Sequence, residues 1–149
     1  MTTNPAAAEL VARSNRLGAD PKNTNYAGAN TSAKGTETDP VTGEPIELLW
    51  VKGSGGDLGT LTESGLAVLR LDRLRALVNV YPGLDREDEM VAAFDYTLHG
   101  KGGAAPSIDT AMHAWSKRTT WTTCTPTPAS PSQPQPTAKA SQSRSSVIA

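Results

Sequence analysis

Residues 46–59 read Ile-Glu-Leu-Leu-Trp-Val-Lys-Gly-Ser-Gly-Gly-Asp-Leu-Gly, an apolar run followed by a loop with four glycines. The run is short, rich in Leu, Trp and Val, and ends at Gly, which predicts a β-strand over Ile46–Lys52. The loop lacks bulky side chains, so its backbone N–H groups can surround an anion. Ser54 adds a hydroxyl donor and Lys52 adds a positive charge. A phosphate-binding loop and a flexible strand-to-helix connection both fit this pattern.

Two common nucleotide-binding motifs do not fit this loop. A Walker loop has Lys followed by Ser or Thr after its glycines, and no such pair follows here. Gly53, Gly55 and Gly59 are spaced one residue too widely for the dinucleotide-binding fingerprint. If the loop binds an anion, it does so in another structural context.

The length and composition indicate one globular domain without charged macromolecular partners. The chain has 149 residues and a formal net charge of −1, so neither nucleic acid nor an anionic membrane is an expected partner. No apolar run approaches the length that crosses a bilayer, and no signal peptide is visible. Cys124 is the single cysteine, which excludes an internal disulfide and is typical of a cytoplasmic protein.

The chain divides into two regions of different composition. Residues 4–114 are patterned and apolar enough to form a core, whereas residues 115–149 are mostly Thr, Ser, Pro, Ala and Gln, without acidic residues. The second region cannot bury enough apolar surface to offset the entropy of ordering it. We therefore expect a domain over 4–114 and a disordered tail over 115–149.

A helix and a hairpin are predicted in the first third of the chain. Asn4 can cap the helix, and Pro5 suits its first position. Residues 23–34 are small and polar, which is typical of a loop followed by a short strand. The turn signal over Asp39–Gly43 would join that strand to Ile46–Lys52 in a hairpin.

A further strand and three helices are predicted between the glycine loop and residue 114. Asp72 and Ser107 can act as helix N-caps, and acidic residues after Asp85 suit the positive end of a helix dipole. These elements are a strand over 66–71, a helix from Asp72 to about Val80 with Leu74, Leu77 and Val78 inward, a helix over 85–99, and a helix that begins after Ser107.

Three loops together carry the functional signal: Ala29-Asn30-Thr31-Ser32, Gly53-Ser54-Gly55-Gly56 and Pro106-Ser107-Ile108-Asp109. On local grounds, Asp109 is simply an acidic residue in the first turn of a helix. The order and spacing of the three loops resemble the class II aldolase and adducin family, over Asn4 to about Ala114. Within that family the resemblance is to the N-terminal part of the long aldolases that are fused to a short-chain dehydrogenase and cleave rhamnulose 1-phosphate.

This resemblance implies a fold and a set of site residues. The implied fold is an α/β, three-layer α/β/α sandwich with a mainly antiparallel central sheet, truncated in this chain. Asp109 matches the family's general acid/base glutamate, although it is one methylene shorter, and Ala29 stands where shorter members have Gly. The residues that match the family's phosphate-binding positions are Asn30, Ser32, Ser54, Gly55 and Ser107.

The family chemistry is a reversible aldol cleavage of a ketose 1-phosphate, here to dihydroxyacetone phosphate and lactaldehyde. In the family, a zinc ion held by a His-x-His pair and a later His stabilises the enediolate, and the intact enzymes are homo-oligomers. This sequence has no such pair: Cys124 is isolated, His113 lies in an expected helix, and His99 is expected at a helix C-terminus. We therefore expect no metal ligands and no zinc in this chain, with a sugar phosphate as its partner.

The missing histidines suggest a reading-frame change. If Thr119–Ala129 is read one base out of frame, compatible codons encode His-His-Val-Asp-His-Leu-His-Pro-Asp-Ser-Gly, which contains the missing pair. The histidine codon CAC read one base late gives an ACN codon, which encodes Thr, so a segment rich in such codons becomes Thr-rich. We hypothesise that residues 115–149 are out-of-frame translation. The product would lack central strands, and we expect marginal stability, poor solubility and no zinc-dependent activity.

Two other functions fit the sequence. Adducin-type relatives keep the fold without metal chemistry, so a non-catalytic binding module is the alternative to an inactive aldolase fragment. A helix-rich fragment whose basic Ser/Pro-rich tail binds a partner is the third possibility.

The nucleotide sequence after the codon for Ala114 tests the frame hypothesis. We expect a second frame there that encodes the His-Leu-His strand and continues an aldolase sequence. Sequencing the gene would disprove the hypothesis if no other frame encodes that strand.

Overall fold

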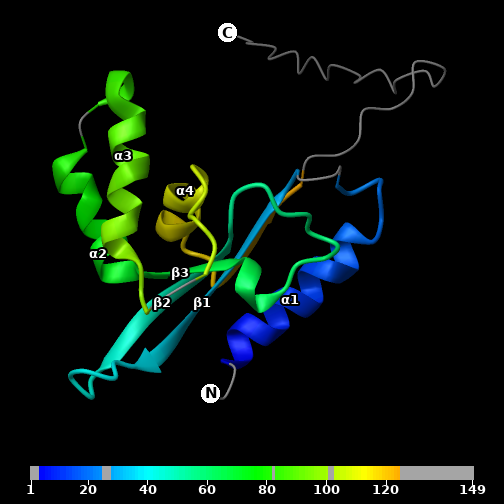
Figure 1. The fold of residues 1–149 in the computed structure, drawn as a ribbon, viewed down its shortest axis with the longest axis horizontal. Coiled ribbons are helices and arrows are strands. Elements are labelled where there is room, and N and C mark those ends of the chain that lie inside the picture. Colours follow the sequence, from blue (N-terminus) through cyan, green and yellow to red (C-terminus); the bar gives the residue numbers. More distant parts are fainter. Residues whose placement is uncertain (1–3, 25–27, 82, 101–102, 125–149) are drawn as a thin grey trace, which may run out of the picture.

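A single antiparallel sheet forms the centre of the computed structural model, which describes residues 4–24, 28–81, 83–100 and 103–124 (Figure 1). In these ranges the sheet has four strands in the order β3-β2-β1-β4. The predicted α/β fold with an antiparallel sheet is confirmed. The strands are β1 (Asn30–Thr38), β2 (Pro45–Lys52), β3 (Leu66–Arg70) and β4 (Thr120–Thr123).

Helices cover both faces of the sheet (Figure 1). Successive side chains of a strand point to opposite faces, so Leu48 of β2 packs with Leu10 of α1, whereas Leu49 packs with Leu74 of α2. No helix in the described part of the chain has the length and apolar character to cross a membrane. The helices are α1 (Pro5–Gly18), α2 (Leu71–Ala76), α3 (Glu87–Ala93) and α4 (Thr110–Trp115), with 3-10 turns η1 (Glu63–Gly65), η2 (Leu77–Val80), η3 (Leu84–Arg86) and η4 (Phe94–Thr97).

Helix α1 begins where the sequence predicts. The Asn4 side chain accepts a hydrogen bond from the Ala6 N–H at 2.9 Å, which satisfies one unpaired donor of the first turn. At the other end, a Cβ on Gly18 would lie 2.1 Å from the backbone nitrogen of Gly59. Glycine is therefore needed at Gly18 for close backbone contact between α1 and the segment after the glycine loop.

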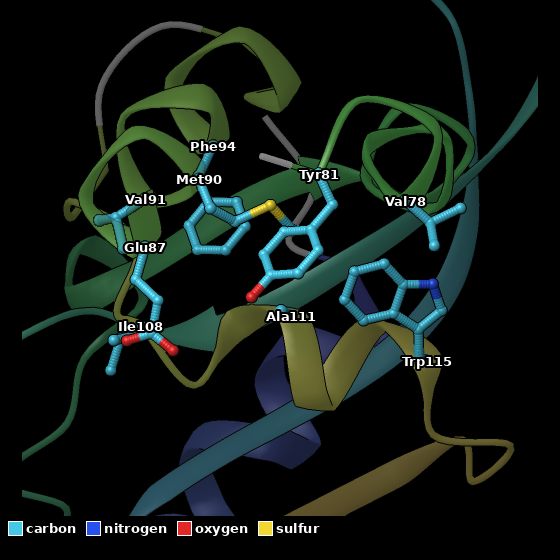
Figure 2. Close-up of a pocket in the computed structure, with 9 residues that line it drawn as sticks. All are labelled: Val78, Tyr81, Glu87, Met90, Val91, Phe94, Ile108, Ala111 and Trp115. Carbon is cyan, nitrogen blue, oxygen red and sulfur yellow. The ribbon is translucent and has the colours of Figure 1, made fainter. Parts of the chain in front are cut away.

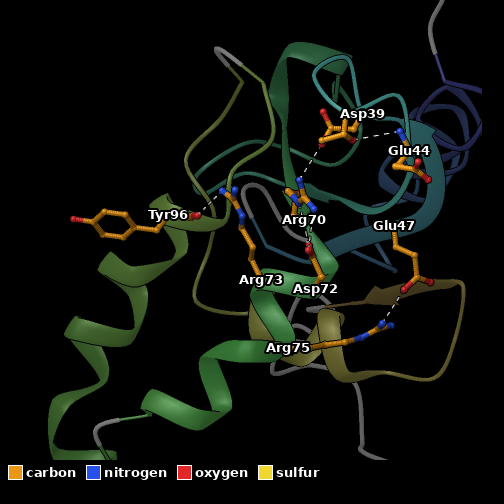
Figure 3. Close-up of polar contacts among 9 residues, drawn as sticks. Asp39, Glu44, Glu47, Arg70, Asp72, Arg73, Arg75 and Tyr96 are labelled. Atoms are coloured by element: carbon orange, nitrogen blue, oxygen red, sulfur yellow. Dashed lines mark hydrogen bonds and ion pairs between the residues drawn. The ribbon is translucent and has the colours of Figure 1, made fainter.

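Asp39 joins the β1–β2 hairpin to β3 (Figure 3). Its carboxylate accepts a hydrogen bond from the Val41 N–H at 2.9 Å and forms an ion pair with Arg70 at 3.1 Å. The Val41 hydrogen bond and the Arg70 charge hold the pKa of Asp39 below its ordinary value, although burial opposes them. The predicted hairpin is therefore present, and its turn is tied to the neighbouring strand.

The predicted cap of α2 is wrong. The helix begins at Leu71, the residue at its N-cap position is Arg70, and no side chain caps it. The Asp72 carboxylate instead forms an ion pair with Arg70 at 2.9 Å (Figure 3). The α-helix then gives way to a 3-10 turn at Leu77, which changes the helical period, so Val78 is 60% exposed and not inward as predicted.

The helix predicted over residues 85–99 is broken into short segments. It consists of η3, α3 and η4 and ends at Thr97. Leu98 then forms an isolated β-bridge with Leu69, and the His99 N–H donates to the Val68 carbonyl at 2.8 Å. His99 is therefore beside β3 and not at a helix C-terminus, because the outer edge of β3 offers backbone partners that a continued helix would leave unpaired.

The disorder predicted from residue 115 is wrong for residues 115–124. Trp115 is the last residue of α4, and β4 pairs with the edge of β1. The Thr31 and Thr122 hydroxyls are 3.1 Å apart, and the Asn30 N–H donates to the Thr123 hydroxyl at 3.2 Å. Composition does not capture this pairing, because Thr suits a strand wherever an edge is free. The rest of the predicted tail, 125–149, lies outside the described residues.

An apolar groove of about 490 Å³ lies on the α3 and α4 side of the sheet. Figure 2 shows Tyr81, Met90 and Trp115 around the space next to Ala111 of α4. Trp115 is 43% exposed and Ile108 is 60% exposed, so the groove presents apolar surface to solvent. Exposed apolar patches of this kind favour association and lower solubility.

The two faces of β2 should contribute separately to stability. Leu48 and Leu49 are both fully buried but lie in different clusters, so we expect Leu48→Ala and Leu49→Ala each to lower the free energy of unfolding by about 2–5 kcal/mol. Val41→Ala is the control, because Val41 is 89% exposed. Urea unfolding measures all three. Equal effects of Leu48→Ala and Val41→Ala would contradict the packing described.

Candidate functional site

The three loops singled out in the sequence meet at one polar cavity of about 280 Å³. It lies where β1 begins, where β2 ends, and in front of α4. Of the six predicted site residues, Asn30, Ser54, Gly55, Ser107 and Asp109 line it, and Ser32 does not. The remaining lining residues are Gly28, Ala29, Lys52, Gly53 and Thr123.

Asn30 holds two of the loops together. Its side-chain nitrogen donates to the Ser107 hydroxyl at 2.6 Å and lies 3.4 Å from a carboxylate oxygen of Asp109. Its side-chain oxygen accepts from the Thr31 N–H at 2.9 Å, and the residue is only 3% exposed. Both ends of the amide are therefore bonded, which fixes the side chain and places the Asp109 carboxylate at the cavity.

The glycine loop is positioned by its own backbone. The Ser54 N–H donates to the Ala105 carbonyl at 3.1 Å, and the Gly53 N–H donates to the Gly65 carbonyl at 2.9 Å. A Cβ at Gly53 would lie 2.2 Å from the Cβ of Ala104, so only glycine fits there. Gly55 has φ +78°, a left-handed conformation that glycine adopts without strain.

Ala29 has the same left-handed conformation without being glycine. Its φ is +68°, and among the described residues it is the non-glycine residue with positive φ. The clash of Cβ with the backbone makes this conformation unfavourable by roughly 1–2 kcal/mol. The sequence departs from the resembled family at this position, and the structure shows that the backbone still adopts the shape suited to glycine.

Lys52 supplies the cationic group of the cavity. It is the last residue of β2, only 3% exposed, and its ammonium donates to the Gly53 carbonyl at 3.2 Å. Burial lowers the pKa of Lys52, and the carboxylates of Asp57 and Asp109 act in the opposite direction. The sequence pattern identified this charge beside the loop but did not include it among the site residues.

Ser32 lies outside the cavity that the other predicted site residues line. Its hydroxyl lies 2.7 Å from Nδ1 of His113, a buried residue of α4. Asn30 and Ser32 share a face of β1, but two residues advance a strand by about 6.6 Å, which carries Ser32 past the cavity. Thr123 is a lining residue that the sequence did not identify, because it lies in the segment predicted to be disordered.

His113 is enclosed between α4, β1 and β4. Its ring centroid is 5.9 Å from that of Trp121, and its Nε2 has no hydrogen-bond partner within the described residues. Burial lowers the pKa of His113, while Asp109 raises it and Lys34 lowers it further. The ring therefore favours its neutral form and joins the helix to the strand through Ser32.

A zinc ion does not fit the residues of this chain. Within residues 4–24, 28–81, 83–100 and 103–124, no three His, Cys, Asp or Glu side chains gather closely enough to hold a metal ion. All such residues of the sequence fall in those ranges. Exposed Cys124 remains an isolated thiol. A catalytic zinc site needs three protein ligands and an open position.

Comparison with known proteins supports the fold. No family model matches the chain. The structure is similar to the N-terminal class II aldolase domain of a conserved protein from Thermoplasma acidophilum, with a TM-score of 0.71 and 28% sequence identity, over 83% of this chain and 56% of that one. The fold is thus similar to that of a class II aldolase domain.

A sequence relative extends over much of the same region. An uncharacterized oxidoreductase of Bacillus subtilis strain 168, YuxG, is 41% identical over 107 residues, which are 72% of this chain. The chain spans about 15% of the length of that relative and about 56% of the structural neighbour.

The strain at Ala29 predicts a stabilising substitution. Ala29→Gly should raise the free energy of unfolding by about 0.5–1 kcal/mol, because relief of the left-handed strain exceeds the added freedom of the unfolded chain. The matched control is Ala33→Gly, a buried position in β1 that should lose stability. Urea unfolding of both variants is the measurement, and a loss of stability in Ala29→Gly would contradict the strain.

Proposed function

We propose that this chain carries the phosphate-anchoring part of a class II aldolase-type site, and that its ligand is a phosphorylated sugar. The observation that carries the proposal is the convergence of Asn30, Ser54 and Asp109, far apart in sequence, on one polar cavity. The similarity of the fold to a class II aldolase domain supports the same assignment. Neither a lone glycine loop nor the fold alone would support it.

The cavity offers the donors that a phosphate group needs. Ser54 and Ser107 line it, and each carries a hydroxyl that can donate to an anion. Gly55 has open space where a side chain would lie, which leaves room for an anion to approach the backbone. Asp109 is held beside Asn30 and would be the group that moves a proton at the bound sugar. From the sequence resemblance, we propose rhamnulose 1-phosphate as the substrate of the intact enzyme, with dihydroxyacetone phosphate and lactaldehyde as products.

We propose that this chain binds such a ligand without cleaving it. The enediolate formed by aldol cleavage needs a strong electrostatic partner, and the donor set for the family's zinc ion does not gather among the described residues. The same observation favours the second candidate, a non-catalytic binding module of the adducin type. Retro-aldol activity in a protein made from the corrected reading frame would separate an interrupted enzyme from such a module.

Hydride transfer is not proposed for this chain, although its Bacillus relative is named as an oxidoreductase. The described residues form an antiparallel sheet, whereas dinucleotides bind at the switch point of a doubly wound parallel sheet. The glycine loop also lacks the fingerprint spacing.

The cellular location, the complete domain architecture and the oligomeric state are also proposed from the sequence. We propose a cytoplasmic location from the single cysteine. From the resemblance, we propose that the intact domain is a three-layer α/β/α sandwich that forms homo-oligomers.

Binding of glycerol 3-phosphate tests the proposal. Isothermal titration calorimetry at pH 8 should detect binding to the full chain, and Ser54→Ala should weaken it roughly 10- to 100-fold, since a hydrogen bond to a charged group is lost. Ser64→Ala is the matched control, because Ser64 is an exposed hydroxyl in η1, outside the cavity. No binding to the wild type, or equal weakening by both variants, would refute the proposal.

A further inference from the structure

We propose that Lys52 selects a doubly charged phosphomonoester for this cavity, by neutralising charge that the hydroxyl and backbone donors leave unbalanced. This inference rests on the proposed function and adds a specificity-determining residue to it. Lys52 is the last residue of β2 and is carried to the cavity wall by the strand that anchors the fold.

The first support is the placement of the ammonium. Only 3% of the surface of Lys52 is exposed, yet the residue lines a polar cavity. Its Nζ donates to the Gly53 carbonyl at 3.2 Å, the acceptor it reaches within the described ranges. An ammonium has three N–H donors, so the Gly53 carbonyl leaves further donors for a ligand. A lysine buried at this depth normally has a charged partner, and a bound anion would provide one.

The second support is the charge balance of the cavity. Among its lining residues, Lys52 carries one positive charge and Asp109 one negative charge, so their formal sum is zero. Without Lys52, an incoming dianion would meet only the Asp109 carboxylate and would be repelled by it. The charged groups that act on Lys52 are the carboxylates of Asp57 and Asp109. Both are side chains of the protein, so a bound ligand would add its negative charge without displacing either of them.

The third support is that the buried charge of Lys52 lowers the stability of the fold. Burial lowers the pKa of Lys52 from its ordinary value of 10.5, so the unfolded chain binds this proton more tightly than the folded chain. Charged Lys52 therefore opposes folding below its folded pKa, and this effect is relieved as pH rises toward 10.5. A side chain that destabilises the empty fold yet lines a cavity is typical of a binding residue.

Lys52→Met tests the inference, because methionine has an unbranched side chain of nearly the same length as lysine but carries no charge. In the full chain at pH 8, calorimetry with glycerol 3-phosphate should show a dissociation constant roughly 10- to 100-fold higher than that of the wild type. Lys34→Met is the matched control: it removes the same charge from a half-buried lysine of β1 that lines a different cavity. That variant should bind glycerol 3-phosphate as the wild type does.

Two further readouts distinguish binding from a structural role. Without ligand, the thermal unfolding midpoint of Lys52→Met should equal or exceed that of the wild type, since a buried charge has been removed. As pH rises from 8 toward the ordinary lysine pKa of 10.5, the affinity of the wild type should fall as Lys52 loses its proton, while the phosphomonoester, with a second pKa of about 6, stays a dianion. Lys52→Met should not show this fall.

The other possible results separate the role of Lys52 from the proposed function. Wild-type affinity in Lys52→Met, together with weakened binding in Ser54→Ala, would overturn the role of Lys52 and leave the proposed function standing. A lower unfolding midpoint in Lys52→Met would show a structural role and also overturn it. If the wild type does not bind glycerol 3-phosphate, the role of Lys52 and the proposed function both fail.

Discussion

Burial of β2 on both faces is the constraint on which the other elements depend. Leu48 faces the cluster that contains α1, and Leu49 faces the cluster that contains α2. Because a strand covered on both sides is fixed in register and direction, the loop that follows it emerges at a defined place. That loop is the glycine loop, and its position in front of α4 creates the cavity. The site is thus a direct consequence of the core.

The cavity concentrates features that do not favour stability. Lys52 is a buried ammonium, Ala29 is held in a left-handed conformation, and the Asp109 carboxylate shares the same small space. Each of these is unfavourable in an empty fold. In the proposed complex, Lys52 would gain a bound anion as its charged partner. Asn30 holds the arrangement together, since both ends of its amide are bonded. The apolar groove on the α3 and α4 side has the opposite character, because its walls are apolar and largely without charge.

The strand β4 shows how a sheet edge can order a sequence of unfavourable composition. Thr120–Thr123 has no apolar core residue of its own, and its neighbours in sequence are Ser, Thr, Lys and Arg. Backbone groups at the edge of β1 pair with it all the same, and the Thr31 and Thr122 hydroxyls meet across the ladder. A four-residue pairing adds little buried apolar area, so β4 depends on β1 and not the reverse.

The sequence by itself determined α1, the β1–β2 hairpin and β3, because local signals agree there: the Asn4 cap, the turn at Asp39 and the apolar run of β2. It also identified five of the residues that line the cavity, through a pattern of loops.

Tertiary structure alone decided the rest. Ser32 lies further along β1 than Asn30 and contacts His113 of α4 instead of the cavity. Lys52 is buried at the end of β2, where it lines the cavity. Strand pairing ordered β4, and the edge of β3 ended the helix expected to reach His99. These outcomes depend on partners distant in sequence, which local periodicity and composition do not contain.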